Sequence, residues 1–370
     1  ADLVLVSVPG QFAFAEASDA LDCGSDVMIF SDNMPVAQEI ALKRRATYEG
    51  RLVLGPDCGT AVVGGAGLGF ANVVRSGPVG IVAASGTGAQ QLLCLLDAAE
   101  VGISACLGVG GRDLSEVVGG LSTRAALDLL DADPGTELIV VVSKPPAPRV
   151  AGEIRARAEA LGTPVVFGLL GPGEPDLTAL AETAVRRLGR DAPSWPTWGS
   201  SRVARAGALR GLYSGGTLCD EAMLIAADAV GAVYSNIPLR PEWALGRSLR
   251  HDGHLMIDFG DDALTQGRPH PMIDHTLRLE RLAAEAADPG AAVVLLDVVL
   301  GHGAHPDPAT ELVPAVSAAC EAGLQVVVAV IGSGGDPQGT GTQAERLAAA
   351  GASVFASNAA AARYAIGLLK

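Results

Sequence analysis

Histidine is missing from the first two-thirds of this 370-residue sequence, and all six copies are then crowded together. They are, in chain order, His251, His254, His270, His275, His302 and His305. Their spacings do not match a zinc motif such as HExxH, so the sequence predicts no metal site. The crowding then indicates either an acid–base site or loop histidines that are held by hydrogen bonds.

Paired cysteines, long apolar runs and positive charge are also scarce. The six cysteines contain no CxxC pair, which argues against zinc ribbons and disulfide scaffolds and favours a reducing, cytoplasmic compartment. No apolar run reaches the roughly 18 residues that span a bilayer, and the first residues lack the basic segment of a secretory signal. The formal net charge of −15 disfavours nucleic acid and membranes as partners, so a small anionic ligand needs a local positive site.

Short apolar runs alternate with amphipathic helical stretches along most of the chain. Repeated strand–helix units of this kind predict an α/β fold, with parallel sheets that are covered by helices on both faces. Proline, serine and tryptophan interrupt the alternation at GRDAPSWPTWGSSR, residues 189–202, which we interpret as a linker.

The pattern after the linker repeats the pattern before it. Residues 79–93 (VGIVAASGTGAQQLL) match residues 209–224 (LRGLYSGGTLCDEAML), and residues 133–146 match residues 288–301 through a DPG-strand. All parallel α/β domains share such features to some degree. Three features in the same order (a glycine loop, an acidic glycine turn and the DPG-strand) nevertheless favour a duplicated domain.

Each half has a glycine loop between a predicted strand and a predicted helix. Ser85, Gly86, Thr87 and Gly88 form the first loop, and Ser214, Gly215, Gly216 and Thr217 form the second. Glycines let backbone N–H groups turn toward an anion, and a helix N-terminus adds partial positive charge. Serine and threonine at such positions also simply cap helices. Two loops in equivalent places favour anion binding, and if the domains pack face to face, both helix ends point at one phosphate.

Charged residues follow other predicted strands, and ligands of open α/β sheets bind outside the carboxyl ends of strands. Arg112 and Asp113 either contact a ligand or close a turn as an ion pair, and Lys144 is either solvated or bound to an anion. After the strand HLMIDFG, prolines on both sides of His270 stiffen the loop that presents it. We expect one cleft to collect Arg268, His270, Asp274 and Arg278, with His302 at the next strand end.

Eight motifs carry a resemblance to a known family: GPDCGTA, GFANVV, GIVAASGTG, GVGGRDLSEVVGG, VSKPP, GLYSGGTL, GRPHPMID and LLDVVLGHGAHPDP. They resemble the FdrA family, a branch of acyl-CoA-synthetase-like proteins that is related to both subunits of succinyl-CoA synthetase. The resemblance implies tandem flavodoxin-like, parallel-sheet α/β domains of succinyl-CoA synthetase type, preceded by a partial Rossmann-like domain of the CoA-binding type. That first domain lacks its opening strand and glycine loop, so either a segment precedes it in the protein or this member is short. The implied domains are residues 1–75 (partial Rossmann-like), 76–190 (first flavodoxin-like), 191–207 (linker) and 208–370 (second flavodoxin-like).

The resemblance also implies which chemistry is kept and which is lost. In succinyl-CoA synthetases two helix N-termini hold a loop with a phosphorylated histidine, and the two glycine loops match those helix starts. The matching segment GLLGPGEPDLTALAETA has no histidine, SKPPAP stands where a supporting glutamate turn is expected, and no ATP-grasp domain is visible. We therefore expect the phosphate site to remain without phosphorylation of an enzyme histidine.

Members of the FdrA family are associated with oxamate carbamoyltransferase, together with two other subunit types. The resemblance thus implies phosphorolysis of an N-carbamoyl acid, such as oxalurate, to carbamoyl phosphate, with phosphate or carbamoyl phosphate as substrate and no firmly predicted cofactor. Donors near the carbamoyl oxygen and the proximity of phosphate would supply the rate. The expected catalytic residues are Arg112, Lys144, Arg268 and His270, supported by Asp113, Asp274 and His302.

Two alternative functions stay open: an acid–CoA ligase that binds CoA, and a non-catalytic scaffold. Partner subunits and a homo-oligomer are expected.

Overall fold

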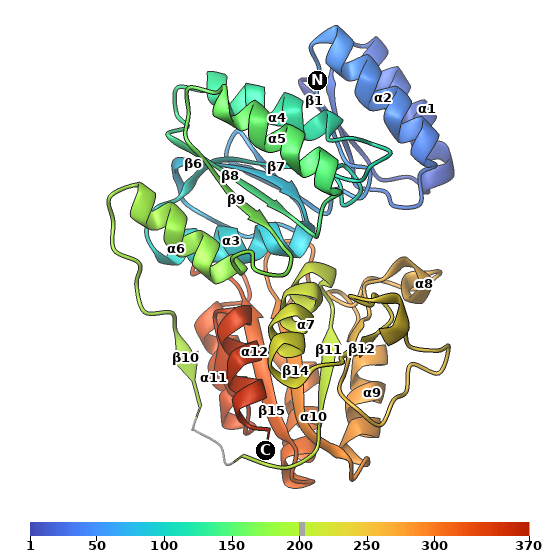
Figure 1. Ribbon diagram of the computed structural model, residues 1–370, viewed down its shortest axis with the longest axis vertical. Coiled ribbons are helices and arrows are strands. Elements are labelled where there is room, and N and C mark those ends of the chain that lie inside the picture. Colours follow the sequence, from blue (N-terminus) through green and yellow to red (C-terminus); the bar gives the residue numbers. More distant parts are fainter. Residues whose placement is uncertain (200–203, 370) are drawn as a thin grey trace. The chain divides into compact units, whose positions relative to one another are not determined.

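The computed structural model describes residues 1–199 and 204–369, and the chain forms two compact α/β units (Figure 1). Unit 1 comprises Ala1–Ala89, Ala99–Pro175 and Ala179–Ala192, and unit 2 comprises Gln90–Ala98, Asp176–Thr178 and Pro193–Lys370. Most strand pairs in both units are parallel, which confirms the predicted fold class. Within the described residues, no helix combines the length and the apolar character that crossing a membrane requires.

The first sheet of unit 1 is small and entirely parallel. Its strands are β1 (Leu3–Val6), β2 (Asp26–Ile29) and β3 (Val53–Leu54), in that order. Helices α1 (Gly10–Asp22) and α2 (Val36–Glu49) bury apolar side chains together with this sheet. The contact is close because α1 presents small side chains, Ala13, Ala17 and Ala20, to Val27 and Ile29. Short side chains at helical spacing let a helix approach a sheet of branched residues.

The second sheet of unit 1 has six strands in the order β5-β4-β7-β6-β8-β9. The strands are β4 (Thr60–Val63), β5 (Ala66–Gly69), β6 (Ser76–Ala84), β7 (Ile103–Gly108), β8 (Leu138–Ser143) and β9 (Val165–Leu169). The helices are α3 (Gly86–Ala98), α4 (Leu121–Ala132), α5 (Pro148–Glu159) and α6 (Leu177–Arg187). Figure 1 shows α4 and α5 on one face of this sheet and α6 on the other. The parallel strands β7-β6-β8-β9 have the 2-1-3-4 order of flavodoxin-like sheets.

The hairpin of β4 and β5 belongs to the second sheet, although it precedes residue 75. Its strand β4 pairs antiparallel with β7 through Val62 and Cys106. Residues 1–75, predicted as one partial domain, therefore contribute to two sheets. The hairpin extends the edge of the larger sheet because β7 would otherwise expose an unpaired ladder there.

Unit 2 has one sheet of seven strands in the order β10-β16-β15-β14-β11-β13-β12. The strands are β10 (Thr197–Trp198), β11 (Ala208–Tyr213), β12 (Tyr234–Ser235), β13 (Leu255–Asp258), β14 (Ala291–Val299), β15 (Gln325–Ile331) and β16 (Ser353–Phe355). Leaving out the edge strands β10 and β12, the order β13-β11-β14-β15-β16 is the 2-1-3-4-5 order of flavodoxin. The duplicated flavodoxin-like sheets that the resemblance implies are thus present in both units.

Helices cover both faces of the unit 2 sheet. They are α7 (Gly216–Val230), η1 (Pro241–Trp243), α8 (Asp262–Thr265), α9 (Thr276–Ala286), α10 (Pro308–Glu321), α11 (Thr340–Ala349) and α12 (Asn358–Gly367). Helices α9, α10 and α11 share one apolar core with the strands. Helices α7 and α12 pack against each other and against the strands. All nine residues of β14 are buried, as expected for a central parallel strand.

Part of the predicted linker, residues 191–207, is a strand. Residues Thr197 and Trp198 form β10, which pairs antiparallel with β16 at the edge of the unit 2 sheet. Residues 200–203 of the predicted linker lie outside the described residues. The proline-rich composition around this strand fits an edge position, where a missing N–H costs no internal ladder bond.

Candidate functional site

The candidate site of unit 2 lies where the strand order of its sheet reverses. The chain leaves β11, builds β13 on one side and then returns to build β14 on the other side. At such a switch point the loops after the two neighbouring strands separate, and ligands of α/β proteins bind there. The predicted glycine loop, from Ser214 to Thr217, follows β11 at this point and begins α7.

The carboxylate of Asp297, on the neighbouring strand β14, accepts hydrogen bonds from the glycine loop. Its Oδ1 accepts the N–H of Ser214 at 2.7 Å, and its Oδ2 accepts the N–H of Gly215 at 2.9 Å. The hydroxyl oxygen of Ser214 lies 3.0 Å from both carboxylate oxygens. The N–H groups of Ser214 and Gly215, predicted to bind an external anion, are therefore occupied by a carboxylate of the chain itself.

The N-cap residue of α7 is Gly215, which has no side chain with which to cap the helix, and the hydroxyl of Ser214 turns to Asp297. The first turn of a helix carries a partial positive charge. The N–H groups of Ser214 and Gly215 are bound to Asp297, so whether the rest of the predicted loop, at Gly216 and Thr217, binds an external anion stays a prediction.

In the matching loop of unit 1, a side chain of the loop itself accepts a loop N–H group. Ser85, which is buried, accepts the N–H of Gly88 at 3.0 Å and so caps α3 directly. Gly86 is exposed, whereas Thr87 is buried. In unit 1 the alternative interpretation of the loop, a serine that caps a helix, is the observed one. Whether this loop also contacts an anion, together with the loop in unit 2, stays a prediction.

A buried arginine supports Asp297. Arg278 on α9 lies 3.0 Å from Asp297 Oδ1 and donates to the carbonyl oxygens of Asp297 and Leu212. Burial lowers the pKa of Arg278 and raises the pKa of Asp297, and the attraction between the two opposes both shifts. Within the described residues, Nε of Arg278 has no hydrogen-bond partner. Arg278 was predicted to face a cleft with Arg268 and His270, but it lies beneath the loop because its guanidinium neutralises a buried carboxylate.

The structure brings His270 to the same loop. Its Nδ1 accepts the N–H of Met272 at 3.2 Å, so the neutral ring carries its proton on Nε2. A Cβ atom added at Gly260 would lie 2.9 Å from His270 Nε2 and 2.6 Å from the carbonyl oxygen of Ser214. The imidazole edge that bears the proton and the backbone of the glycine loop therefore face the same small space.

Asp258, at the end of β13, borders this space as well. Its Oδ1 accepts the N–H of Gly260 at 2.8 Å and lies 3.1 Å from the same added Cβ position. Its backbone is held on both sides by the amide of Asn236, at 2.9 and 3.0 Å. Asp258 is buried, and the negative charge of Asp258 raises the pKa of Arg278, against the lowering by burial. Analysis of the sequence missed Asp258 and Asp297, although each is a lone carboxylate in or at the end of an apolar strand.

Three residues that were predicted for this site lie elsewhere or are not held in it. Arg268 is exposed. Asp274 Oδ1 accepts the N–H of Thr276 at 2.8 Å, so it caps the start of α9, and its hydrogen bonds with Thr276 lower the pKa of Asp274. His302 is exposed in the loop after β14. The predicted cleft of Arg268, His270, Asp274 and Arg278 is not formed, because the loop ends in a helix cap.

The other histidines have separate structural roles. His275 Nδ1 lies 2.9 Å from Glu311, and His305 Nε2 lies 3.2 Å from the same carboxylate. Burial lowers the pKa of His275 to about 4.

The ring of His251 stacks on Tyr234. His254 accepts the N–H of Leu209 at 3.0 Å. Among the described residues, no group of histidine, cysteine or acidic side chains is arranged to hold a metal ion.

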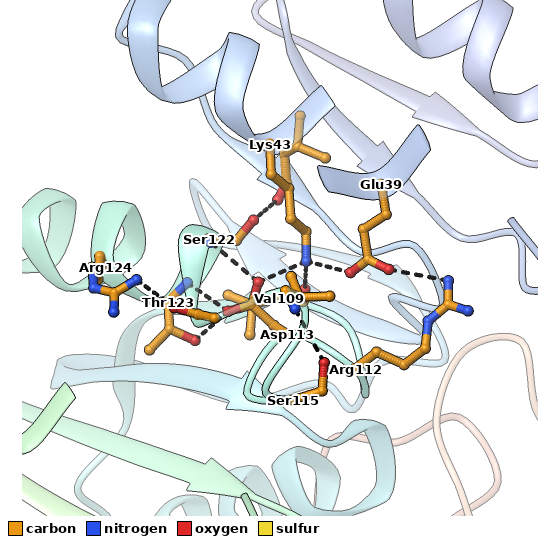
Figure 2. A network of polar contacts seen from close by, with 12 residues as sticks. Glu39, Lys43, Val109, Arg112, Asp113, Ser115, Ser122, Thr123 and Arg124 are labelled. Carbon is orange, nitrogen blue, oxygen red and sulfur yellow. Dashed lines mark hydrogen bonds and ion pairs between the residues drawn. The ribbon is translucent and has the colours of Figure 1, made fainter. Parts of the chain in front are cut away.

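Arg112 and Asp113 of unit 1 belong to a buried charge network (Figure 2). Lys43 donates to Glu39 at 2.8 Å, to the carbonyl oxygen of Val109 at 2.9 Å and to Asp113 at 2.7 Å. Arg112 forms an ion pair with Glu39 at 3.1 Å. Three ammonium donors with three acceptors fully satisfy the buried lysine. The network joins α2 to the loop after β7.

Asp113 also receives donors from the start of α4. Its two oxygens accept the N–H groups of Ser122 and Thr123 at 3.2 and 2.9 Å, and the hydroxyl of Thr123 at 2.6 Å. Arg112 donates to the carbonyl oxygen of Met34 at 2.8 Å. These contacts assign both residues to holding unit 1 together. Arg112 was predicted to be catalytic; its guanidinium contacts a carboxylate and a carbonyl oxygen, and the catalytic role stays a prediction.

Lys144 follows β8, at the point where the strand order of unit 1 reverses. The last register pair of β6 and β8 joins Ala84 to Ser143, so Lys144 and Ser85 leave neighbouring strand ends. Lys144 is half-buried. Of the cations that the sequence predicted for unit 1, Lys144 is the one at the position where flavodoxin-like sheets bind ligands.

Comparisons with known proteins give a family. Residues 212–368 match the family model described as CoA-ligase. The uncharacterized protein YahF of Escherichia coli strain K12 is 41% identical over 384 residues, covering 96% of this chain and 75% of YahF. This chain belongs to the YahF family. The candidate site residues from Ser214 to Asp297 all lie inside the CoA-ligase match.

Other similar proteins are ligases of acids and CoA. The succinate–CoA ligase [ADP-forming] subunit alpha of Methanothermobacter thermautotrophicus is 26% identical over 241 residues, covering 63% of this chain and 70% of that subunit. The solved structure of the dinucleotide-forming acetyl-coenzyme A synthetase 1 of Ca. Korarchaeum cryptofilum, in complex with phosphate and ADP, is 18% identical. It covers 100% of this chain and 85% of that chain, with a TM-score of 0.36.

Proposed function

We propose that this chain is a subunit of an acid–CoA ligase of succinyl-CoA synthetase type, and that unit 2 binds the phosphate of an acyl phosphate at the start of α7. The observation that carries the proposal is the position of the α7 start, which follows β11 at the switch point of a flavodoxin-like sheet. The CoA-ligase match over residues 212–368 supports it. This reading replaces carbamoyl transfer as the leading candidate, because the similar proteins are CoA ligases.

The residues of unit 2 suit a reaction in which negative charge develops on a leaving phosphate. When the thiolate of CoA attacks the acyl carbon of an acyl phosphate, a carbon–sulfur bond forms, the carbon–oxygen bond breaks and phosphate leaves with the electron pair. The N–H groups at the start of α7 would stabilise the growing negative charge on phosphate. His270 would donate a hydrogen bond from its Nε2–H to a phosphate oxygen, and Asp297 with Arg278 would keep the loop rigid. A local positive site of this kind would also overcome the repulsion of a chain with net charge −15.

Carbamoyl transfer is the second candidate, and one observation favours it. The segment GLLGPGEPDLTALAETA, residues 168–184, contains no histidine that could carry phosphate from a nucleotide. In an FdrA-type enzyme, inorganic phosphate would instead attack the carbamoyl carbon of an N-carbamoyl acid such as oxalurate, and the amide would leave with a proton. The same α7 start would hold the attacking phosphate. Partner subunits are expected under both candidates, since the succinate–CoA ligase relative is itself one subunit of its enzyme.

Titration calorimetry of the full chain separates the candidates. Inorganic phosphate, CoA and carbamoyl phosphate are added to the wild-type protein and to His270→Ala. Binding of both phosphate and CoA supports the ligase, and binding of phosphate and carbamoyl phosphate without CoA supports carbamoyl transfer. A wild-type protein that binds none of the three contradicts both. The assay of acyl-CoA formation, with the partner subunits added, then tests the ligase directly.

A further inference from the structure

We infer that the glycine loop of unit 2 is a carboxylate-binding site that the chain fills itself, and that Asp297 thereby determines which external anions the loop accepts. The tethered carboxylate keeps free carboxylates away from the N–H groups of Ser214 and Gly215. This specificity rests on the proposed function, because the acid substrate of a ligase is itself a carboxylate. The geometric part, a carboxylate site with an internal occupant, concerns the chain alone.

The donors around Asp297 form a complete set for one carboxylate. Its Oδ1 accepts the N–H of Ser214 at 2.7 Å and lies 3.0 Å from Arg278, and its Oδ2 accepts the N–H of Gly215 at 2.9 Å. The hydroxyl of Ser214 lies 3.0 Å from both oxygens. Neighbouring backbone N–H groups, a hydroxyl and a guanidinium bind oxyanions in general, whether or not the anion is tethered.

The guanidinium of Arg278 makes an anion necessary at this place. Arg278 and Asp297 are both buried, and Nε of Arg278 has no hydrogen-bond partner among the residues that the structure describes. A buried charge that loses its partner is strongly destabilising. Removal of the Asp297 side chain would therefore leave a vacated space beside an unpaired cation, and a small free carboxylate suits both.

The matching position of unit 1 carries no carboxylate. The last register pair before the glycine loop of unit 1 joins Ala84 to Ser143. In unit 2 the pair of Leu212 and Leu296 places Asp297 at the corresponding point, one position further along β14. The hydroxyl of Ser143 donates to the carbonyl oxygen of the next residue at 2.6 Å. Joining the two strands at this point thus does not require a carboxylate, and the internal anion is a property of unit 2.

The experiment measures urea unfolding of the full chain in sodium formate and in sodium chloride of equal ionic strength. In Asp297→Gly, formate is the probe that can take the place of the missing carboxylate. We expect formate to raise the urea midpoint of Asp297→Gly, with half-saturation on the order of 10 mM, and to leave that of the wild-type protein unchanged. Since unfolding is measured at equilibrium, the rate at which formate enters does not matter. An equal response of both proteins would overturn the inference.

Two controls separate a specific site from a general effect of salt. Ser143→Gly empties the corresponding position of unit 1 without leaving a buried guanidinium unpaired, so its response to formate should equal that of the wild-type protein. Propionate should stabilise Asp297→Gly less than formate does, because the vacated space holds only a short side chain. Equal effects of the two carboxylates would argue against a site of this size.

Calorimetry with inorganic phosphate tests the specificity. Formate should compete with phosphate in Asp297→Gly and should leave phosphate binding to the wild-type protein unchanged. Competition in the wild-type protein would contradict the role of Asp297. If the wild-type chain binds no phosphate, the proposed function fails, whereas the response of Asp297→Gly to formate still decides whether the loop is a carboxylate site.

A double variant keeps the test decisive if Asp297→Gly does not fold in chloride. Arg278→Met added to Asp297→Gly removes both charges, and an apolar replacement of a buried ion pair is usually tolerated. We expect the double variant to fold and to show no response to formate, whereas Asp297→Gly should fold once formate is added. A single variant that stays unfolded in formate, or a double variant that responds as strongly as the single one, would refute the proposed site.

Discussion

The carboxylate of Asp297 on β14 binds the backbone and the hydroxyl of Ser214, the residue that follows β11. This contact joins the two strands between which the strand order reverses. It also occupies the N–H group of Ser214, and the second oxygen of the carboxylate occupies that of Gly215. The sequence predicted that the whole loop binds an external anion. In the structure the Asp297 carboxylate already accepts the N–H groups of its first two residues.

Removing that internal anion should destabilise the protein strongly. In Asp297→Ala, Arg278 would be left as an uncompensated buried charge, and two loop N–H groups would lose their acceptor. Breaking a buried ion pair in this way costs about 3–5 kcal/mol of unfolding free energy. Urea denaturation of the wild-type protein and of Asp297→Ala measures this loss of unfolding free energy. The control is Asp228→Ala, an exposed aspartate of α7, for which a change within about 0.5 kcal/mol is expected.

The charge network in unit 1 predicts losses of stability of very different size for substitutions at two neighbouring residues. Asp113→Ala leaves the buried Lys43 without its closest acceptor, and we expect a loss of about 3–5 kcal/mol in unfolding free energy. Arg112 is partly exposed, so Arg112→Ala should cost about 1 kcal/mol or less. Both values come from denaturation curves of the full chain. A loss of activity in Arg112→Ala at unchanged stability would restore the catalytic role that the sequence predicted.

Glu221 predicts a dependence of stability on pH. This residue of α7 is buried, its oxygens accept the N–H of Leu177 at 2.6 Å and the amide of Asn358 at 2.7 Å, and burial raises the pKa of Glu221 to about 7. The folded state then holds the proton more tightly than the unfolded state, where the value is near 4.5. The contribution of this group is therefore fully present below about pH 4.5 and is lost as the pH rises to 7.

The comparison with Glu221→Gln isolates that effect. The variant stays neutral at all pH values, so the wild-type protein should lose about 3 kcal/mol of unfolding free energy relative to it between pH 4.5 and pH 8. Denaturation at several pH values gives the difference. A difference that does not change with pH would show that the pKa of Glu221 is the same in the folded and the unfolded state.

His275 predicts the opposite slope. Its pKa is lowered to about 4 by burial, whereas the unfolded value is 6.5, so the folded state holds the proton less tightly. The contribution is present above pH 6.5 and is lost as the pH falls through 4. Relative to His275→Gln, the wild-type protein should lose roughly 3 kcal/mol over that range. Equal acid sensitivity of the two proteins would mean that the Glu311 pair keeps His275 protonated after folding.

The sequence predicts the sheets better than the site, for a physical reason. Alternation of apolar and amphipathic segments is local information, and it predicts the parallel sheets of both units, whereas their flavodoxin-like order was implied by the family resemblance. The contact between Ser214 and Asp297 spans 83 positions and depends on which strands become neighbours. Asp297 could have been noticed as the lone charge in AAVVLLDVVL, but its partner could not be named from that run alone.

Histidine illustrates the same limit. His270 was chosen because flanking prolines and a strand end are visible in the sequence; the structure brings it near the loop, and its catalytic role stays a prediction. Asp274, four positions later, looks equally suitable, yet it caps α9 because the helix begins there. Arg278 could have been recognised as buried from its place on the apolar side of an amphipathic helix, with Leu282 one turn later.

The path of the chain between its units has a consequence for inheritance. Helix α3 begins in unit 1 and ends in unit 2, and the short segment Asp176–Thr178 returns to unit 2 before α6 continues in unit 1. A single crossover between two related genes thus cannot exchange one unit as a whole. If the halves arose by duplication, as the sequence predicts, substitutions in the two units are expected to be inherited together.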